Sequence, residues 1–166
     1  TELASSYGGG IYLQNGTLTM KTGAEISGSE ASVSGGGVYI SARDGGTASF
    51  KMEDGTISGC KVSSSNNPVD GGGVCVEVVQ GSTGTANFIM QGGSITGCKA
   101  EINHNAGTPE SRGGGVYMEN STFNMSGNSR ITGCTAESSD SDISGSPSFY
   151  GGGAYAAGST ATFTMK

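Results

Sequence analysis

The amino-acid sequence predicts a right-handed parallel β-helix, an all-β solenoid in which each turn of the chain is one triangular coil. Two observations support this prediction. A glycine triplet followed by an apolar-X-apolar pattern recurs five times, and two further short segments with alternating apolar residues follow each of the first four triplets. Such repeats predict a solenoid, because one repeat cannot bury its apolar face alone and must stack on its neighbours.

The triplets begin at Gly8, Gly35, Gly71, Gly113 and Gly151, at intervals of 27, 36, 42 and 38 residues. The segments that begin with them are GGGIYL, GGGVYI, GGGVCV, GGGVYM and GGGAYA. The second element of each repeat contains one of the pairs Leu18 and Met20, Phe50 and Met52, Phe88 and Met90, Phe123 and Met125, and Phe163 and Met165.

The third element occurs four times, as AEISGSEA, GTISGCKV, GSITGCKA and SRITGCTA. Turn-forming Gly, Ser, Asn and Asp residues separate the elements, which therefore predict three short strands per coil. Coils stacked at about 4.8 Å would place equivalent strands in parallel sheets. We expect one domain over residues 1–166, with four to five coils at 8–34, 35–70, 71–112, 113–150 and, in part, 151–166.

Side chains alternate along a strand, so the first and third residues after each triplet should point into the core. The first inward column contains Ile11, Val38, Val74, Val116 and Ala154. We read the chain as a fragment of a longer solenoid, because its end coils lack caps. Uncapped coils expose strand edges that invite end-to-end stacking.

Composition agrees with a solenoid and excludes other classes. The chain has 32 glycines, 33% hydrophobic residues and no tryptophan. A solenoid needs only a few inward side chains per coil, since neighbouring coils cover them. The net charge is −6 and no Lys/Arg cluster occurs, which argues against nucleic-acid binding. No apolar run approaches the roughly 18 residues of a membrane helix, and we expect neither membrane insertion nor a cofactor.

The pattern GGG-[IV]-Y-[LIVM], F-x-M and G-x-I-[ST]-G resembles the repeats of bacterial cell-surface β-helix proteins. It is also loosely similar to the GGA[IV] repeats of polymorphic outer-membrane autotransporter passengers. The resemblance spans Gly8 to Lys166. It implies a pectate-lyase-like fold in a secreted or surface-anchored bacterial protein, commonly one with an adhesive role.

An outward column of tyrosines is the first candidate binding feature. It contains Tyr12, Tyr39, Tyr117 and Tyr155, and Cys75 interrupts it. Neighbouring glycine columns would leave a shallow surface trough beside these rings. Aromatic rings with polar tips along a trough suit an extended glycan or peptide. The alternative is that stacked tyrosines only stabilise the sheet.

Glu77 and Glu119 are the only stacked carboxylates that we find in the outward columns. Carboxylates on adjacent coils can raise one another's pKa, bind calcium or act as a retaining glycosidase pair. No Arg or Lys column is expected beside them. Two exposed glutamates without a catalytic role are therefore the alternative.

Three cysteines, Cys60, Cys98 and Cys134, occupy equivalent positions in successive coils, where the first coil has Ser29. A coil spacing of about 4.8 Å is compatible with the Cα separation of a disulfide, roughly 4.4–6.8 Å. The pattern favours buried free thiols that pack as small apolar groups. No metal site is expected, because the one histidine, His104, falls in a predicted loop.

The insertions that precede the triplets grow along the chain: SVS, SSSNNPVD, EINHNAGTPESR and ESSDSDISGSPSFY. Loops on one face of a repeat protein often carry recognition. The leading hypothesis is a non-catalytic surface-display or adhesion module that binds a host glycan or protein. A second is a polysaccharide lyase or hydrolase that uses Glu77 and Glu119. A third is a structural spacer.

Overall fold

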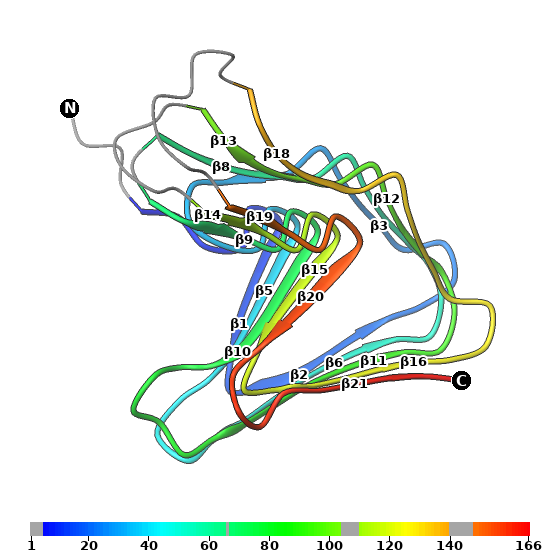
Figure 1. The fold of residues 1–166 in the computed structure, drawn as a ribbon. Coiled ribbons are helices and arrows are strands. Elements are labelled where there is room, and N and C mark those ends of the chain that lie inside the picture. The colour runs from blue at the N-terminus through cyan, green and yellow to red at the C-terminus, as the bar shows by residue number, and fades with distance from the viewer. Residues whose placement is uncertain (1–4, 66, 104–109, 140–147) are drawn as a thin grey trace.

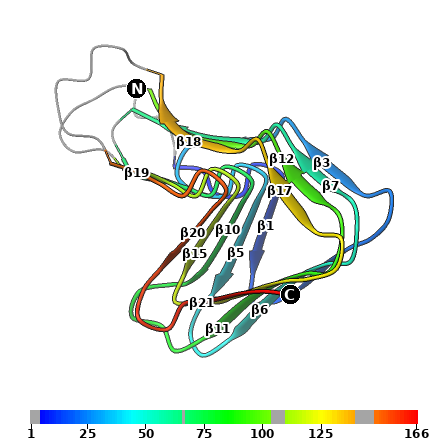
Figure 2. The same cartoon turned by 45° about the vertical axis from the view of Figure 1, so that its right-hand side comes forward.

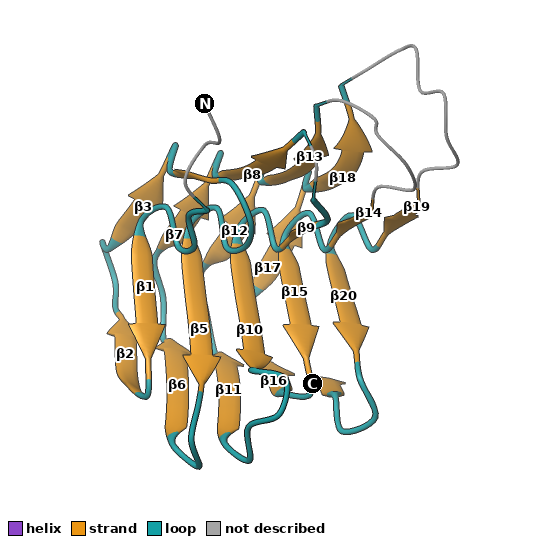
Figure 3. Ribbon diagram, turned by 90° about the vertical axis from the view of Figure 1, so that its left-hand side faces the viewer, coloured by secondary structure: helices purple, strands orange, loops and turns teal. Residues whose placement is uncertain are grey.

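A computed structural model confirms the parallel β-helix. It describes residues 5–65, 67–103, 110–139 and 148–166, and every regular element in this part of the chain is a strand. The strands form five parallel sheets. In Figure 1 the chain runs counter-clockwise while it advances from β1 at the back to β20 in front, an order that Figure 3 shows from the side, so the solenoid is right-handed.

Three sheets enclose the triangular core (Figure 1). The first sheet contains β1 (Ile11–Gln14), β5 (Val38–Ala42), β10 (Val74–Val78), β15 (Val116–Glu119) and β20 (Ala154–Ala157). The second sheet contains β2 (Gly16–Met20), β6 (Thr47–Met52), β11 (Thr85–Met90), β16 (Thr122–Met125) and β21 (Thr162–Met165). The third sheet contains β3 (Glu25–Ser27), β7 (Thr56–Ser58), β12 (Ser94–Thr96) and β17 (Arg130–Thr132).

Two further sheets form a projection that we call the flange (Figures 1 and 2). Its upper layer contains β4 (Glu30–Ala31), β8 (Lys61–Ser64), β13 (Lys99–Ile102) and β18 (Thr135–Ser138). Its lower layer contains β9 (Val69–Asp70), β14 (Glu110–Arg112) and β19 (Ser148–Tyr150). The predicted third element is thus two strands, and the ends of the insertions are strands as well. Residues 66, 104–109 (with His104) and 140–147 lie outside the described part.

The strands stack in the predicted register, so like residues lie on like. Val38 pairs with Ile11 on one side and with Val74 on the other. The rings of Phe50, Phe88 and Phe123 stack with centroids 4.8 and 4.6 Å apart and planes within 6° of parallel. The first and third residues after the triplet are fully buried in coils two to four: Val38 and Ile40, Val74 and Val76, and Val116 and Met118. The predicted core is confirmed.

The glycine triplets are buried in coils two to four, so the predicted surface trough is wrong. They form the inner corner between the flange and the first sheet. The first glycine of each triplet has a positive φ, +66° at Gly71, which suits a residue without a side chain. The third packs against a thiol: a Cβ on Gly73 would lie 3.2 Å from Sγ of Cys98.

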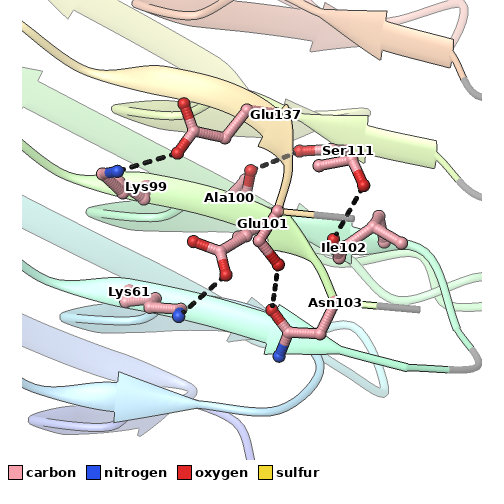
Figure 4. A network of polar contacts seen from close by, with 10 residues as sticks. Lys61, Lys99, Ala100, Glu101, Ile102, Asn103, Ser111 and Glu137 are labelled. Carbon is pink, nitrogen blue, oxygen red and sulfur yellow. Dashed lines mark hydrogen bonds and ion pairs between the residues drawn. The ribbon is translucent and has the colours of Figure 1, made fainter. Parts of the chain in front are cut away.

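The flange has a small core of its own, formed by Ala31, Val62, Val69, Ala100 and Ile102. The Ser111 hydroxyl, in the lower layer, donates a 2.5 Å hydrogen bond to the Ala100 carbonyl in the upper layer (Figure 4). Ion pairs join successive coils of the upper layer: Lys61 to Glu101 at 3.0 Å, and Lys99 to Glu137 at 2.7 Å. The flange is therefore a packed extension of the solenoid.

Candidate binding face

The first sheet, whose outer face is turned to the viewer in Figure 3, has two columns of outward residues, and a third column lies beside it at the edge of the flange. The column that directly precedes the triplets contains Tyr7, Ser34, Asp70, Arg112 and Tyr150. The tyrosine column contains Tyr12, Tyr39, Cys75, Tyr117 and Tyr155. The last column contains Gln14, Ser41, Glu77, Glu119 and Ala157.

The predicted tyrosine stacking is confirmed, but the predicted exposure is wrong in the middle of the column. Ring centroids are 5.2 Å apart for Tyr12 and Tyr39, and 6.0 Å apart for Tyr117 and Tyr155. Tyr39 and Tyr117 are each only 1% exposed, whereas Tyr12 is 45% exposed.

Side chains of the column before the triplets contact these rings. The Tyr7 ring lies 5.0 Å from that of Tyr39, and the Arg112 guanidinium lies 5.0 Å from the centre of the Tyr117 ring. No ligand can stack along the whole column, because its two central rings already have protein neighbours.

The tyrosine hydroxyls hold the two glutamates that the sequence singled out. Glu77 and Glu119 are paired on adjacent strands, as predicted. The Tyr117 hydroxyl donates to Oε2 of Glu119 at 2.9 Å, and the Tyr39 hydroxyl donates to Oε1 of Glu77. Burial raises the pKa of both tyrosines, so they stay protonated as donors. Burial also raises the pKa of Glu77.

Asp70 and Arg112, which the sequence did not single out, form an ion pair on the same face. Nε and Nη2 of Arg112 donate to the two carboxylate oxygens of Asp70 at 2.7 and 2.9 Å. The pair is fully formed yet largely buried, and burial raises the pKa of Asp70 to about 6 although the guanidinium opposes that shift. We call Asp70, Glu77, Arg112 and Glu119 the outer-face polar cluster.

The glutamates have no column of Arg or Lys in the strand register beside them, but two single arginines lie near them. Arg112 approaches the face from the lower layer of the flange, and it is joined by Arg43, which follows β5. The positive charges of Arg43 and Arg112 both act to lower the pKa of Glu77. The repeat pattern does not align Asp70 with Arg112, because these two residues end insertions of different length. Their shared place before a triplet is the signal that could have found them.

Two polar groups beside Glu77 lack a partner within the described structure. Ser41 is the cross-strand neighbour of Glu77, is fully buried, and its hydroxyl makes no hydrogen bond. Nε of Arg43 is likewise buried without a partner. Buried polar groups are nearly always hydrogen-bonded, so two such groups together mark an unusual place.

A cavity of about 270 Å³ adjoins this face at the corner between the first and second sheets. It is lined by residues 78–84, Asn120 and Thr160. The connections after β5 and β10 project further here than those of the later coils (Figure 1, lower left). Two lining residues, Val78 and Asn120, directly follow Glu77 and Glu119 in the chain. The rest of the lining is mostly Gly, Ser, Thr and Gln.

The thiols are free, as the sequence favoured. Cys60 and Cys98 are fully buried, and Cys134 is partly exposed. The Sγ atom of Cys134 donates to the Ile95 carbonyl at 3.8 Å. Hydrogen bonding from Cys98 lowers the pKa of the Cys134 thiol to about 7. A lowered pKa and access to solvent together make a cysteine reactive.

We therefore expect Cys134 to react first with a thiol reagent. At pH 7.5, the aromatic disulfide DTNB should label one thiol of the folded chain rapidly and the other three only after unfolding in urea. Replacing Cys134 with Ser should abolish the fast phase. A fast phase that survives this substitution would contradict the expectation.

No group of three or more His, Cys, Asp or Glu residues in the described part of the chain is arranged to hold a metal ion. In the same residues, no helix has the length and apolarity needed to cross a membrane. Comparison with protein-family models, with curated proteins and with solved structures finds no match.

Proposed function

We propose that this chain is a rigid, non-catalytic binding module of a secreted or cell-surface bacterial protein, and that it engages a host glycan or protein through the outer face. The observation that supports this is the assembly of the outer-face polar cluster from successive coils of one packed scaffold. The resemblance to surface β-helix repeats supports the location. End-to-end stacking of solenoids stays a prediction.

The fixed pairs within the cluster favour binding. Glu77, Glu119 and Asp70 are each held by a neighbouring side chain, through Tyr39, Tyr117 and Arg112. Held side chains do not have to be ordered when a partner arrives, which reduces the free energy that binding must overcome. The same hydrogen bonds occupy carboxylate oxygens that a catalytic acid or base would need free for contact with a substrate.

A polysaccharide-active enzyme is the second candidate. It is favoured by the pairing of Glu77 with Glu119 on adjacent strands, and by the burial that raises the pKa of Glu77. Two carboxyl groups with different affinity for protons can serve as acid and base around one glycosidic bond. Release of reducing ends or unsaturated fragments from a polysaccharide panel, abolished in Glu119→Gln, would establish this candidate instead.

The binding proposal is tested by adhesion of beads that carry the chain to epithelial cells, mucin and fibronectin. We expect saturable adhesion to at least one surface, lost in the double variant Glu77→Lys, Glu119→Lys because the face reverses its charge. The matched control is Glu25→Lys, on the exposed strand β3 of another sheet. Equal adhesion of the double variant would show that the chain binds through another surface. Absence of adhesion to every surface would favour the structural spacer.

A further inference from the structure

The cavity of about 270 Å³ at the corner between the first and second sheets lies outside the outer-face polar cluster. We infer that it is a binding site for one neutral sugar residue of an oligosaccharide. None of the residues that line it belongs to that cluster, so it is a second site beyond the one proposed above.

The cavity exists because successive coils have connections of unequal length. The connection after β10 has six residues, 79–84, and the connection after β20 has four, 158–161. The connection between them, after β15, has only two, 120–121. Stacked strands hold the three connections side by side, so the short one lies in a recess between two longer ones. Residues of all three connections line the cavity, which the packed scaffold therefore forms before any ligand arrives.

Asn120, in the short connection, offers the cavity a hydrogen-bond donor that the protein does not use. Asn15 is its counterpart after β1, and both residues have φ +48°. The Asn15 amide is engaged twice by the next coil: Nδ2 donates to the Arg43 carbonyl at 3.2 Å, and Oδ1 accepts from the Arg43 N–H at 3.0 Å. Oδ1 of Asn120 accepts a hydrogen bond from the Thr160 hydroxyl at 3.3 Å, but within the described structure its Nδ2 donates to no group. Asn120 is partly exposed, so a ligand in the cavity can reach this donor.

The lining favours a neutral, hydroxyl-rich ligand. No charged side chain lines the cavity, so an ion would lose water there without gaining a counter-charge. The polar side chains of the lining, all at least partly exposed, are the hydroxyls of Ser82, Thr83 and Thr160 and the amides of Gln80 and Asn120. Sugar hydroxyls suit these groups, because each hydroxyl both donates and accepts. Val78 and Val79 add a small apolar area for the C–H groups of a sugar ring.

The size of the cavity limits the ligand to one residue. At about 270 Å³ it is slightly smaller than the pockets that hold drug-sized ligands, which measure roughly 300–1,000 Å³. It therefore has room for a single sugar ring, while the rest of an oligosaccharide would remain in solvent. Binding should follow the identity of that residue, and the free monosaccharide should compete.

A glycan array that displays neutral, sialylated, sulfated and amino oligosaccharides tests the site. We expect binding to neutral oligosaccharides that share one sugar residue, about tenfold weaker in Asn120→Gly and several-fold weaker in Thr83→Val, because each variant loses one ligand-facing group. Glycine adopts the left-handed conformation of Asn120 readily, so the first variant should fold. The matched controls are Asn15→Gly, with the same φ but outside the lining, and Thr56→Val in the third sheet. Both should bind as the parent chain does.

Absence of binding to every oligosaccharide, a preference for sulfated or sialylated chains, or unchanged binding in either cavity variant would each overturn the site. Equal weakening in Asn15→Gly would do the same, because that residue does not line the cavity. Thr83 is exposed, so Thr83→Val decides the matter even where Asn120→Gly fails to fold.

The bead assay separates this result from failure of the proposed function. Adhesion that is lost in the double variant Glu77→Lys, Glu119→Lys but kept in Asn120→Gly would leave the outer-face binding module in place. Together with a negative array, it would remove only the sugar site.

Discussion

Gly72→Ala is expected to prevent the chain from folding. Gly72 is the middle residue of the third triplet, at the corner where β10 approaches the flange. A Cβ there would lie 2.3 Å from the Gly114 carbonyl oxygen in the next coil and 2.3 Å from the Lys99 carbonyl carbon in its own coil. Both neighbours are backbone atoms: Lys99 lies in β13, and the Gly114 oxygen accepts a hydrogen bond from the backbone N–H of Gly73, so neither can move without disturbing the contacts between coils.

The loss should exceed about 4 kcal/mol, the range reached only by substitutions that disrupt packing or backbone geometry. We expect little soluble protein, or a circular dichroism melting temperature lowered by at least about 10 °C. Gly97→Ala is the matched control: Gly97 has φ +61° but nothing within 4 Å of the added methyl group. It should lose only about 1–2 kcal/mol, the usual left-handed penalty. Similar melting of both variants would contradict the steric argument.

The fold could be predicted from the sequence because identical residue types recur at identical places in each coil. Phe50, Phe88 and Phe123 stack as their spacing predicted. The flange could not be predicted from the same pattern. Its strands β9, β14 and β19 lie at the ends of insertions of unequal length, so they have no constant distance from the preceding element.

The flange also explains where the site prediction failed. The alternation of β5 and β15 correctly placed Tyr39 and Tyr117 outward, yet it carried no information on what packs against that side. Tyr7 and Arg112, which directly precede their triplets, pack against these rings. Glu77 and Glu119 could be predicted as neighbours because they share one column. Ser41 and Arg43 could not, because a missing hydrogen bond is visible only in three dimensions.

Arg112→Met is expected to destabilise the fold by about 3–5 kcal/mol near pH 8. The side chains of Asp70 and Arg112 are only 12% and 23% exposed, so the substitution leaves a carboxylate with little water and no cation. Removing one partner of a buried pair typically has an effect of this size. Methionine keeps an apolar stem over Tyr117, which separates the lost charge from lost packing.

The effect should shrink as the pH falls. Burial raises the pKa of Asp70 from the ordinary 3.8 to about 6. A carboxyl group whose pKa is raised on folding contributes stability that is fully present below about 3.8 and is lost as the pH rises through about 6. Without Arg112, the charged form is disfavoured further, so Arg112→Met should be closest to the parent chain below pH 5 and furthest from it at pH 8.

Urea unfolding at pH 5 and pH 8 measures both effects. The double variant Asp70→Asn, Arg112→Met should recover most of the stability lost at pH 8, because no charge is left buried without a partner. Lys99→Met, which breaks the more exposed pair with Glu137, is the control and should lose less than about 1 kcal/mol. An equal loss for Arg112→Met at both pH values would show that the guanidinium acts through its cation–π contact with Tyr117 and not through the charge of Asp70.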